Sequence, residues 1–84
     1  MKLVFAEQAW EDYLHWQATD RRLLQGIHAL NKEASRTPFE GSGKPEPLRH
    51  ALFGFWSRRI NEEHRMIYKV DGDSLLIAQL RYHY

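Results

Sequence analysis

The stretch HRMIYKVDGDSLLIAQLRYHY, residues 64–84, decides the fold. Two runs of strand-forming residues, 64–70 and 74–84, flank a short polar connection at residues 71–74. The Asp71-Gly72 pair in this connection is a strong signal for a tight turn between antiparallel strands. The sequence therefore predicts a β-hairpin that carries the residues RYHY at the end of its second strand.

The segments before the hairpin complete a small α+β pattern. Residues 50–60 form a third strand-like run, and residues 1–5, MKLVF, are short, apolar and β-prone. Residues 6–18 and 21–34 have apolar side chains at helical spacing, and either Asp20 or Thr19 can cap the second helix. Trp10, Tyr13, Leu14 and Gln17 lie at helical spacing in the first helix, and the apolar stripe of the second helix is Leu23, Leu24, Ile27, Leu30 and Ala34.

These elements predict a fold of the α+β class. An N-terminal strand precedes two helices, which pack on one face of a small twisted antiparallel sheet, because each helix has one apolar stripe to bury. Residues 35–47 contain all three prolines and form a loop. The face of the sheet that the helices leave uncovered is open to solvent or to a ligand.

Strand alternation assigns side chains to the two faces of the sheet. Met66, Tyr68 and Val70 are expected on the helix side, together with Leu76, Ala78 and Leu80. The opposite face then carries one basic surface made of Arg59, Arg65, Lys69, Arg81 and His83. Two interpretations stay open: an ordinary solvated face, or a phosphate-binding concavity, since the guanidinium fork matches phosphate geometry.

Length and composition exclude several classes of protein. Eighty-four residues predict a single domain, 1–84, with a thin core, so a partner or a second copy is expected to add stability. The chain has no cysteine and no apolar run that could span a membrane, which favours a reducing, cytoplasmic setting. The net charge is only +1, but residues 43–84 carry a net charge of +2 and three of the five histidines. This asymmetry hints at an anionic ligand.

The loop presents a carboxylate on a stiff mount. Glu46 lies between Pro45 and Pro47, so its backbone has little freedom. It is either an ordinary surface residue or, with His83 and the arginines, part of an acid–base site. Such a set suffices for RNA cleavage by attack of the ribose 2′-oxygen on the adjacent phosphate. We expect no metal or cofactor, because the sequence has no HExxH, P-loop or GxGxxG motif. His50 and His64 are expected to bind RNA or to be solvated.

Three segments resemble the YoeB-like toxins of the RelE/ParE superfamily: RTPFEGSGKPEPL at 36–48, GFWSRRINEEHRMIY at 54–68 and RYHY at 81–84. The resemblance covers essentially the whole chain. It implies a RelE-like, microbial-ribonuclease-like fold. It also implies a toxin of a type II toxin–antitoxin module that cleaves translated mRNA in the ribosomal A site. The implied partners are a YefM-like antitoxin, the ribosome with its mRNA, operator DNA through the antitoxin complex, and a second copy in a homodimer.

The resemblance also implies roles for individual residues. Glu46 is the general base, Arg65 the phosphate-stabilising cation, His83 the general acid, and Tyr84 a terminal residue that shapes the site. Lys44, Arg49 and Arg59 fall where cations would contact RNA. Two alternatives remain: a non-enzymatic ParE-like gyrase inhibitor, and a plain RNA-binding module. The acid–base set argues against the gyrase inhibitor, because a pure binder does not need one, and the RNA-binding module stays open.

Overall fold

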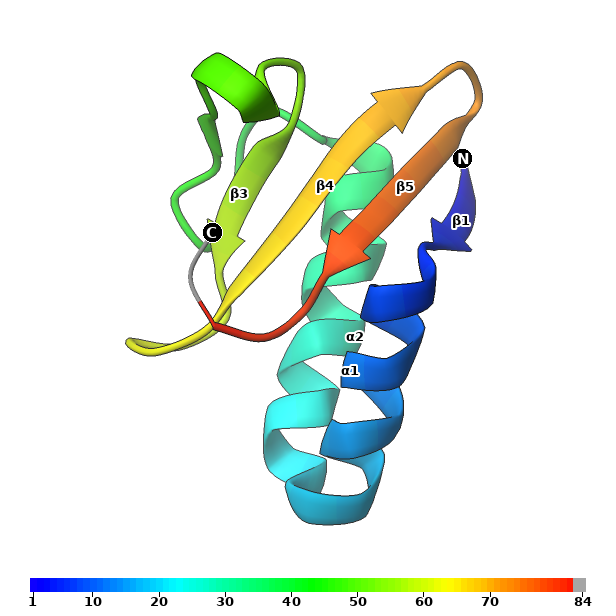
Figure 1. The fold of residues 1–84 in the computed structure, drawn as a ribbon, viewed down its shortest axis with the longest axis vertical. Helices are drawn as coiled ribbons and strands as arrows, with labels where there is room; N and C mark the ends of the chain where they lie inside the picture. The colour runs from blue at the N-terminus through cyan, green and yellow to red at the C-terminus, as the bar shows by residue number, and fades with distance from the viewer. Residues whose placement is uncertain (83–84) are drawn as a thin grey trace.

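The computed structural model describes residues 1–82 and has two layers, a five-stranded sheet and a pair of helices that cover one face of it (Figure 1). The strands lie in the order β1-β5-β4-β3-β2. In chain order the elements are β1 (Lys2–Phe5), α1 (Glu7–Thr19), α2 (Arg21–Arg36), β2 (Glu46–Pro47), a 3₁₀ turn (His50–Leu52), β3 (Trp56–Arg59), β4 (Arg65–Asp71) and β5 (Ser74–Gln79). Neither helix is long and apolar enough to cross a membrane.

The predicted hairpin is confirmed, and so is the antiparallel pairing of the last three strands. β3, β4 and β5 pair antiparallel, and the hairpin closes with Asp71 opposite Ser74. β1 lies beside β5 in parallel, with Lys2 opposite Ser74 and Phe5 opposite Ile77, so the sheet as a whole is mixed. Side-chain alternation in a short strand does not encode the direction of its neighbour, which is why the sequence did not reveal this pairing.

The second helix follows its predicted pattern. Asp20 caps α2 by accepting a hydrogen bond of 3.0 Å from the Leu23 N–H. It also ends α1, so the two helices are joined without a loop. The predicted stripe is buried at Leu24, Ile27, Leu30 and Ala34.

The apolar pattern of α1 was assigned to the wrong positions. Ala9, Asp12 and Trp16 are buried, while Trp10 and Leu14 are exposed. Long-range hydrogen bonds explain the difference: the Leu80 N–H donates to Asp12 Oδ2 and Trp16 Nε1 donates to the Leu80 carbonyl, each at 2.9 Å. A buried carboxylate is tolerated at this interface because its partners satisfy it.

A β-bulge in β5 corrects the predicted faces of that strand. Tyr68 pairs with Ile77, but the preceding residue, Ile67, pairs with Gln79, so Ala78 is an extra residue. Before the bulge, Leu75 and Ile77 enter the core in place of the predicted Leu76 and Ala78. After the bulge the phase reverses, and Leu80 is buried as predicted.

Candidate active site on the open face of the sheet

Two of the predicted site residues meet on the face of the sheet that the helices leave uncovered. Arg65 begins β4 and Glu46 begins β2, and Arg65 Nη1 lies 3.5 Å from Glu46 Oε1. The same nitrogen donates to Ser57 Oγ at 3.4 Å. Strand pairing produces this arrangement, because Glu46 lies opposite Ser57 and Arg59 lies opposite Arg65. The Glu46 side chain is 51% exposed and that of Arg65 only 16%, so the pair consists of an accessible carboxylate and a fixed cation.

Further cations border this pair. Lys44 and Arg49 are exposed on either side of Glu46 in the chain, and Arg59 is exposed across the strand pair from Arg65. A hollow of about 530 Å³ adjoins Glu46 and is lined by Glu46, Pro47, Leu48, Arg49, His50 and Leu52. The site therefore combines the exposed carboxylate of Glu46, the mostly buried guanidinium of Arg65 and room for an anionic ligand.

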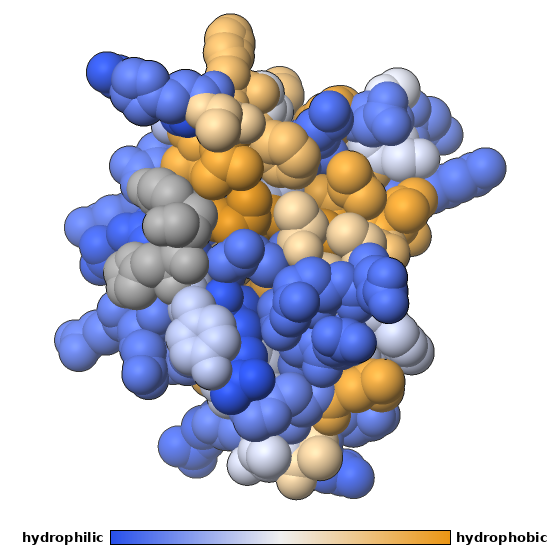
Figure 2. Space-filling model, in the orientation of Figure 1, coloured by the Kyte–Doolittle hydropathy of each residue, from blue (hydrophilic) through white to orange (hydrophobic). Residues whose placement is uncertain are grey.

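The single basic surface predicted for this face is divided. The Arg81 guanidinium packs on the rings of Trp16 at 5.8 Å and Tyr82 at 4.7 Å, so it lies toward α1. Lys69 Nζ lies 5.2 Å from the Phe55 ring centre. In Figure 2 an apolar patch lies in the upper middle of the surface with hydrophilic side chains to its left and right, and most of the lower part, over the helices, is hydrophilic. Arg81 is therefore not part of the predicted basic surface, because β5 ends at Gln79 and the chain then turns away from the sheet.

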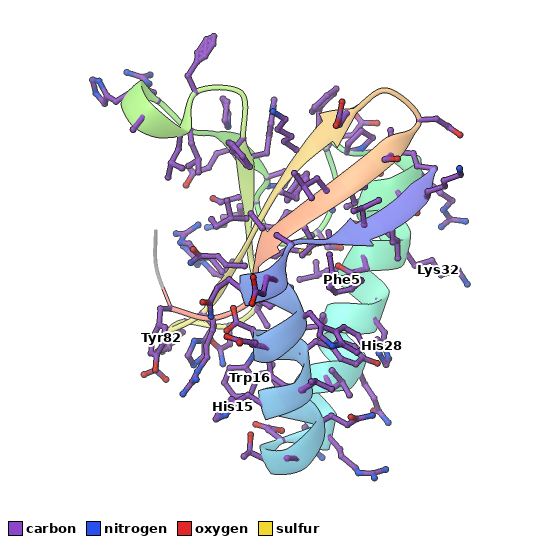
Figure 3. All side chains as sticks on the ribbon, turned by 45° about the vertical axis from the view of Figure 1, so that its right-hand side comes forward. Phe5, His15, Trp16, His28, Lys32 and Tyr82 are labelled. Atoms are coloured by element: carbon purple, nitrogen blue, oxygen red, sulfur yellow. The ribbon has the colours of Figure 1, made fainter. Side chains whose placement is uncertain are left out.

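The C-terminal segment is fastened beside Arg65. The Tyr82 N–H donates to His64 Nδ1 at 2.8 Å, and the Tyr82 carbonyl accepts from the Arg65 N–H at 3.1 Å. With the two bonds at Leu80 and a bond of 2.9 Å from Gln79 Nε2 to the Arg81 carbonyl, five hydrogen bonds fix the main chain of residues 80–82. Trp16 and Tyr82 lie on one side of α1, and Phe5 and His28 lie on the other (Figure 3). His83 and Tyr84, the other two predicted catalytic residues, lie outside the described residues.

His64 has a structural position. Its side chain is buried, and its ring packs against those of Trp16 at 4.7 Å and Tyr82 at 5.7 Å. Because Nδ1 accepts from Tyr82, the ring proton lies on Nε2, which faces Glu63 at 3.4 Å. The expectation that His64 is solvated or contacts RNA was wrong, since long-range packing covers it.

Replacing His64 by Phe tests this attachment. The variant keeps a ring between Trp16 and Tyr82 but leaves the Tyr82 N–H without its acceptor, so we expect a loss of about 1–3 kcal/mol in the free energy of unfolding. Urea unfolding measures it. His15→Phe is the matched control, since the His15 ring also packs on Trp16 and should change stability by less than about 0.5 kcal/mol. Equal stability of both variants would contradict the role of His64.

A buried arginine supports the loop that carries Lys44 and Glu46. Arg58 is fully buried. It donates to Tyr68 Oη at 3.0 Å and to Glu33 Oε2 at 2.7 Å. Its remaining donors reach the loop carbonyls of Thr37, Glu40 and Ser42. The loop therefore wraps around one guanidinium. The sequence contained a signal for this buried arginine, because strand alternation places Arg58 on the same face of the predicted strand as the apolar Trp56 and Ile60.

Electrostatics agree with this arrangement. The Ser42 N–H and hydroxyl and the Arg58 guanidinium hold the pKa of Glu33 below its ordinary value of 4.5, although partial burial opposes them. Burial raises the pKa of Tyr68 above its ordinary 10.0, against the effect of Arg58. Tyr68 therefore stays protonated and donates to the Pro38 carbonyl at 2.6 Å, which attaches the start of the loop to β4.

The lowered pKa of Glu33 predicts acid sensitivity. Unfolding restores the ordinary pKa, so the unfolded chain binds more protons, and the contribution of Glu33 is lost as the pH falls through and below 4.5. Glu33→Gln should therefore flatten the decline of the urea midpoint between pH 7 and about pH 3. Glu11→Gln, at an exposed carboxylate of α1, serves as the control. The same acid decline in wild type and Glu33→Gln would contradict this prediction.

Gly43 fixes the exit of the loop toward Glu46. Its φ of 83° is left-handed, and an added Cβ would lie 2.9 Å from the Arg59 carbonyl oxygen. Its own carbonyl accepts from the Arg59 N–H at 2.7 Å. Only glycine fits this close approach of loop and strand.

In the described part of the chain no group of three or more His, Cys, Asp or Glu side chains could hold a metal ion.

The fold is the one that the small RelE-like toxins have. A chain of the RelBE2 toxin–antitoxin complex from Mycobacterium tuberculosis has the same fold, with a TM-score of 0.75 at 22% identity over 98% of this chain and 96% of that one. This chain belongs to the YoeB-like toxins: residues 5–84 match the family described as "YoeB-like toxin of bacterial type II toxin-antitoxin system". Toxin YoeB of Escherichia coli K12 is 63% identical to it over the full length of both.

Solved structures of the family agree with this assignment. A YoeB/ParE toxin from Agrobacterium tumefaciens is 50% identical and superposes with a TM-score of 0.97 over all of both chains. YoeB from Staphylococcus aureus is 44% identical over 100% of this chain and 98% of that one. It has been solved as a heterotetramer with YefM, TM-score 0.91, and as a dimer, TM-score 0.92.

Proposed function

We propose that this toxin is a ribosome-dependent endoribonuclease that cleaves mRNA in the ribosomal A site and so inhibits translation. The observation that carries the proposal is the Glu46–Arg65 pair, 3.5 Å apart on the open face of the sheet. It places an accessible proton acceptor beside a fixed cation, the two groups that transfer of a phosphate ester needs most.

The reaction assigns one task to each residue. Glu46 removes the proton of a ribose 2′-hydroxyl, and the 2′-oxygen attacks the adjacent phosphorus. The bond to the 5′-oxygen breaks, and His83 protonates that oxygen as the general acid. Arg65 neutralises charge on the phosphorane, held in place by Ser57. The products are a 2′,3′-cyclic phosphate and a free 5′-hydroxyl, without a metal or cofactor.

The remaining site residues serve binding. Lys44, Arg49 and Arg59 surround the pair with exposed positive charge, which suits flanking phosphates. Tyr84, the residue that follows His83 in the sequence, is assigned the task of shaping the site. The support for a C-terminal contribution is the attachment of Tyr82 beside Arg65, because His83 is the next residue of the chain.

The proposed partners follow the same assignment. A YefM-like antitoxin neutralises the toxin, as the S. aureus complex suggests, and operator DNA is contacted only through that complex. A homodimer is proposed by analogy with the S. aureus dimer. The ribosome and its mRNA place the activity in the cytoplasm.

Primer extension on a translated message tests the proposal. Added to a translating extract, the protein should produce new cuts on ribosome-bound mRNA, with 5′-hydroxyl ends that a kinase can label directly. The same message without ribosomes should stay intact. Inhibition of DNA gyrase supercoiling without RNA cleavage would instead support the ParE-like alternative and overturn the nuclease assignment.

A further inference from the structure

Tyr82, the last of the described residues, has a left-handed backbone. Its φ is 64°, a conformation that residues with a side chain avoid because Cβ then crowds the carbonyl oxygen. Burial of the side chain does not offset this strain, since Tyr82 is 56% exposed. The backbone angles at Tyr82 set the direction in which the chain continues to residue 83. Strain that the surrounding structure holds in place is typical of functional sites.

Two hydrogen bonds hold the main chain on the two sides of the Tyr82 Cα. The Tyr82 N–H donates to His64 Nδ1 at 2.8 Å, and the Tyr82 carbonyl accepts from the Arg65 N–H at 3.1 Å. Arg65 is also the cation that lies 3.5 Å from Glu46. The bond from Arg65 joins two main-chain groups, so it does not require a particular side chain. The bond at the Tyr82 N–H does, because its acceptor is the His64 ring.

The acceptor on His64 is itself held in one place. The His64 N–H donates to Asn61 Oδ1 at 2.7 Å, and the His64 carbonyl accepts from the Ile60 N–H at 2.9 Å, which fixes its main chain in the turn between β3 and β4. The ring lies between those of Trp16 and Tyr82 and is almost fully buried. A side chain whose ring is fixed by packing can hold a neighbouring group precisely.

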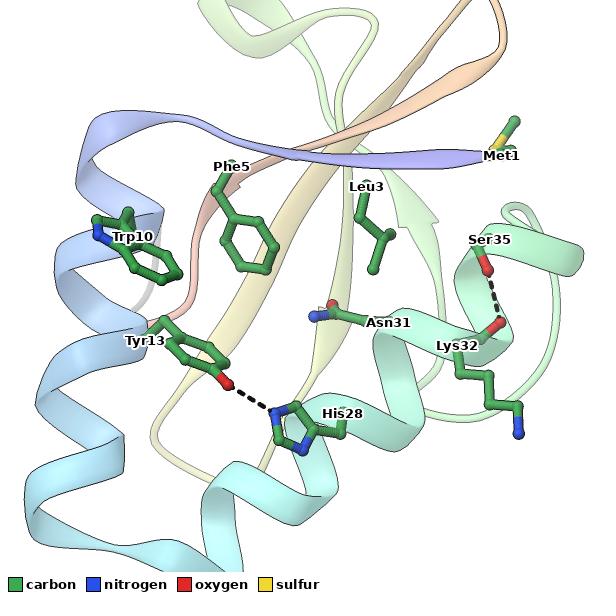
Figure 4. A pocket seen from close by; sticks show the side chains of 9 residues that line it. All are labelled: Met1, Leu3, Phe5, Trp10, Tyr13, His28, Asn31, Lys32 and Ser35. Carbon is green, nitrogen blue, oxygen red and sulfur yellow. Dashed lines mark hydrogen bonds between the residues drawn. The ribbon is translucent and has the colours of Figure 1, made fainter.

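The other described histidines are placed differently. His28 lines a hollow between β1, α1 and α2, where it pairs with Tyr13 Oη at 3.0 Å, so that two side chains bond to each other (Figure 4). His15 is half-buried and packs on Trp16, and His50 is exposed. Among the histidines of residues 1–82, only His64 is buried. Burial and a main-chain partner in the C-terminal segment therefore coincide at His64.

We propose that His64 is a positioning residue of the candidate site. It holds Tyr82 in the left-handed conformation and so directs the next residue, His83, toward the phosphate ester at the Glu46–Arg65 pair. His64 exchanges no proton with the substrate; its Nδ1 only accepts from the main chain. This inference rests on the proposed function, which assigns the general acid to His83. Loss of the acceptor should slow the step in which the P–O bond breaks and the 5′-oxygen takes the proton of His83.

His64→Phe and His64→Asn separate the acceptor from the ring. Phenylalanine keeps a ring between Trp16 and Tyr82 but has no acceptor. Asparagine loses the ring but carries Oδ1 on the same Cγ that carries Nδ1 in histidine, so it can still accept from the Tyr82 N–H. Single-turnover cleavage on programmed ribosomes should slow about tenfold or more in His64→Phe and stay within about threefold of the wild type in His64→Asn.

Stability should rank these two variants in the opposite order. His64→Asn gives up the packing of a buried ring, so its urea midpoint should fall further than that of His64→Phe. The rates are compared where the urea curves show both variants folded. Ribosome binding by both should stay within about twofold of the wild type, because a positioned acid acts in the chemical step. His15→Phe, the matched control on the other contact of Trp16, should cleave within about twofold of the wild type. Cleavage rates that follow the urea midpoints would show a structural role and overturn the proposal.

A modified message tests whether the affected group is the acid. Sulfur replaces the 5′-bridging oxygen at the mapped cut, so the P–S bond breaks and the thiolate leaves without a proton from an acid. His64→Phe should cleave this message within about threefold of the wild type. A tenfold loss on both messages would place the defect at Glu46 or Arg65 and overturn the proposal.

The wild type distinguishes failure of this inference from failure of the proposed function. If the wild type cleaves neither message on the ribosome, the proposed function is rejected, and the role of His64 with it. If the wild type cleaves the ordinary message and His64→Phe does so at the same rate, only the role of His64 is rejected.

Discussion

Replacing Arg58 by methionine is expected to lower the free energy of unfolding by about 3–5 kcal/mol. The change removes the guanidinium that donates to the loop carbonyls of Thr37, Glu40 and Ser42, and it leaves Glu33 without its buried cation. Small domains have a total stability of only about 5–15 kcal/mol, so the variant should be largely unfolded well below the wild-type melting temperature. Urea unfolding followed by tryptophan fluorescence measures the difference.

Two further variants isolate the reason. Arg58→Lys keeps the positive charge but cannot reach acceptors on Tyr68, Glu33 and the loop together, so it should recover only part of the loss. Arg59→Met changes the exposed neighbour and should alter stability by less than about 0.5 kcal/mol. Stability of Arg58→Met within 1 kcal/mol of the wild type would show that the loop does not depend on this guanidinium.

Features encoded by neighbouring residues were predictable. The Asp71-Gly72 turn, the Asp20 cap and the stripe of α2 each depend on residues a few positions apart, and the structure confirms all three. The Glu46–Arg65 pair was also within reach, because the resemblance supplied the two residues and the structure brings them within 3.5 Å.

The differences arise from contacts between residues far apart in the chain. The local pattern predicts Asp12 on the exposed side of an amphipathic helix, but its carboxylate accepts a hydrogen bond from the Leu80 N–H, 68 positions away. The local pattern likewise predicts a solvated turn residue at His64, yet its Nδ1 accepts a hydrogen bond from the Tyr82 N–H. The bulge at Ala78 reverses the alternation of β5 for a reason that no local pattern records. Each of these features depends on where the C-terminal segment crosses α1 and β4.

These same long-range contacts prepare the candidate site. Asp12 and Trp16 hold Leu80 against α1, and His64 and the Arg65 N–H hold Tyr82. On the opposite side Arg58 and Gly43 hold the loop that leads to Glu46. The loop and the C-terminal segment are therefore both attached to regular elements, which is the preorganisation that the proposed catalysis needs.

Glu46→Gln is expected to lower cleavage of ribosome-bound mRNA by about 10²–10⁴-fold, the usual contribution of a general base. The amide cannot take up the proton of the ribose 2′-hydroxyl, although it keeps the shape of the side chain. Glu46 is half-exposed and its ion pair with Arg65 spans 3.5 Å, so stability should change by less than about 1 kcal/mol. Single-turnover cleavage on programmed ribosomes measures the rate, and sedimentation of the same ribosomes measures binding.

Comparison of rate and binding distinguishes a base from a residue that only contacts the substrate. A general base acts in the transition state, so ribosome binding by Glu46→Gln should stay within about twofold of the wild type while the rate falls. Glu62→Gln, at an exposed carboxylate between β3 and β4, should change neither quantity. A fall in binding that accounts for the whole loss of rate would assign Glu46 to substrate contact, and an unchanged rate would remove it from the site. Only a loss confined to the chemical step makes the proline-flanked carboxylate the group that accepts the proton.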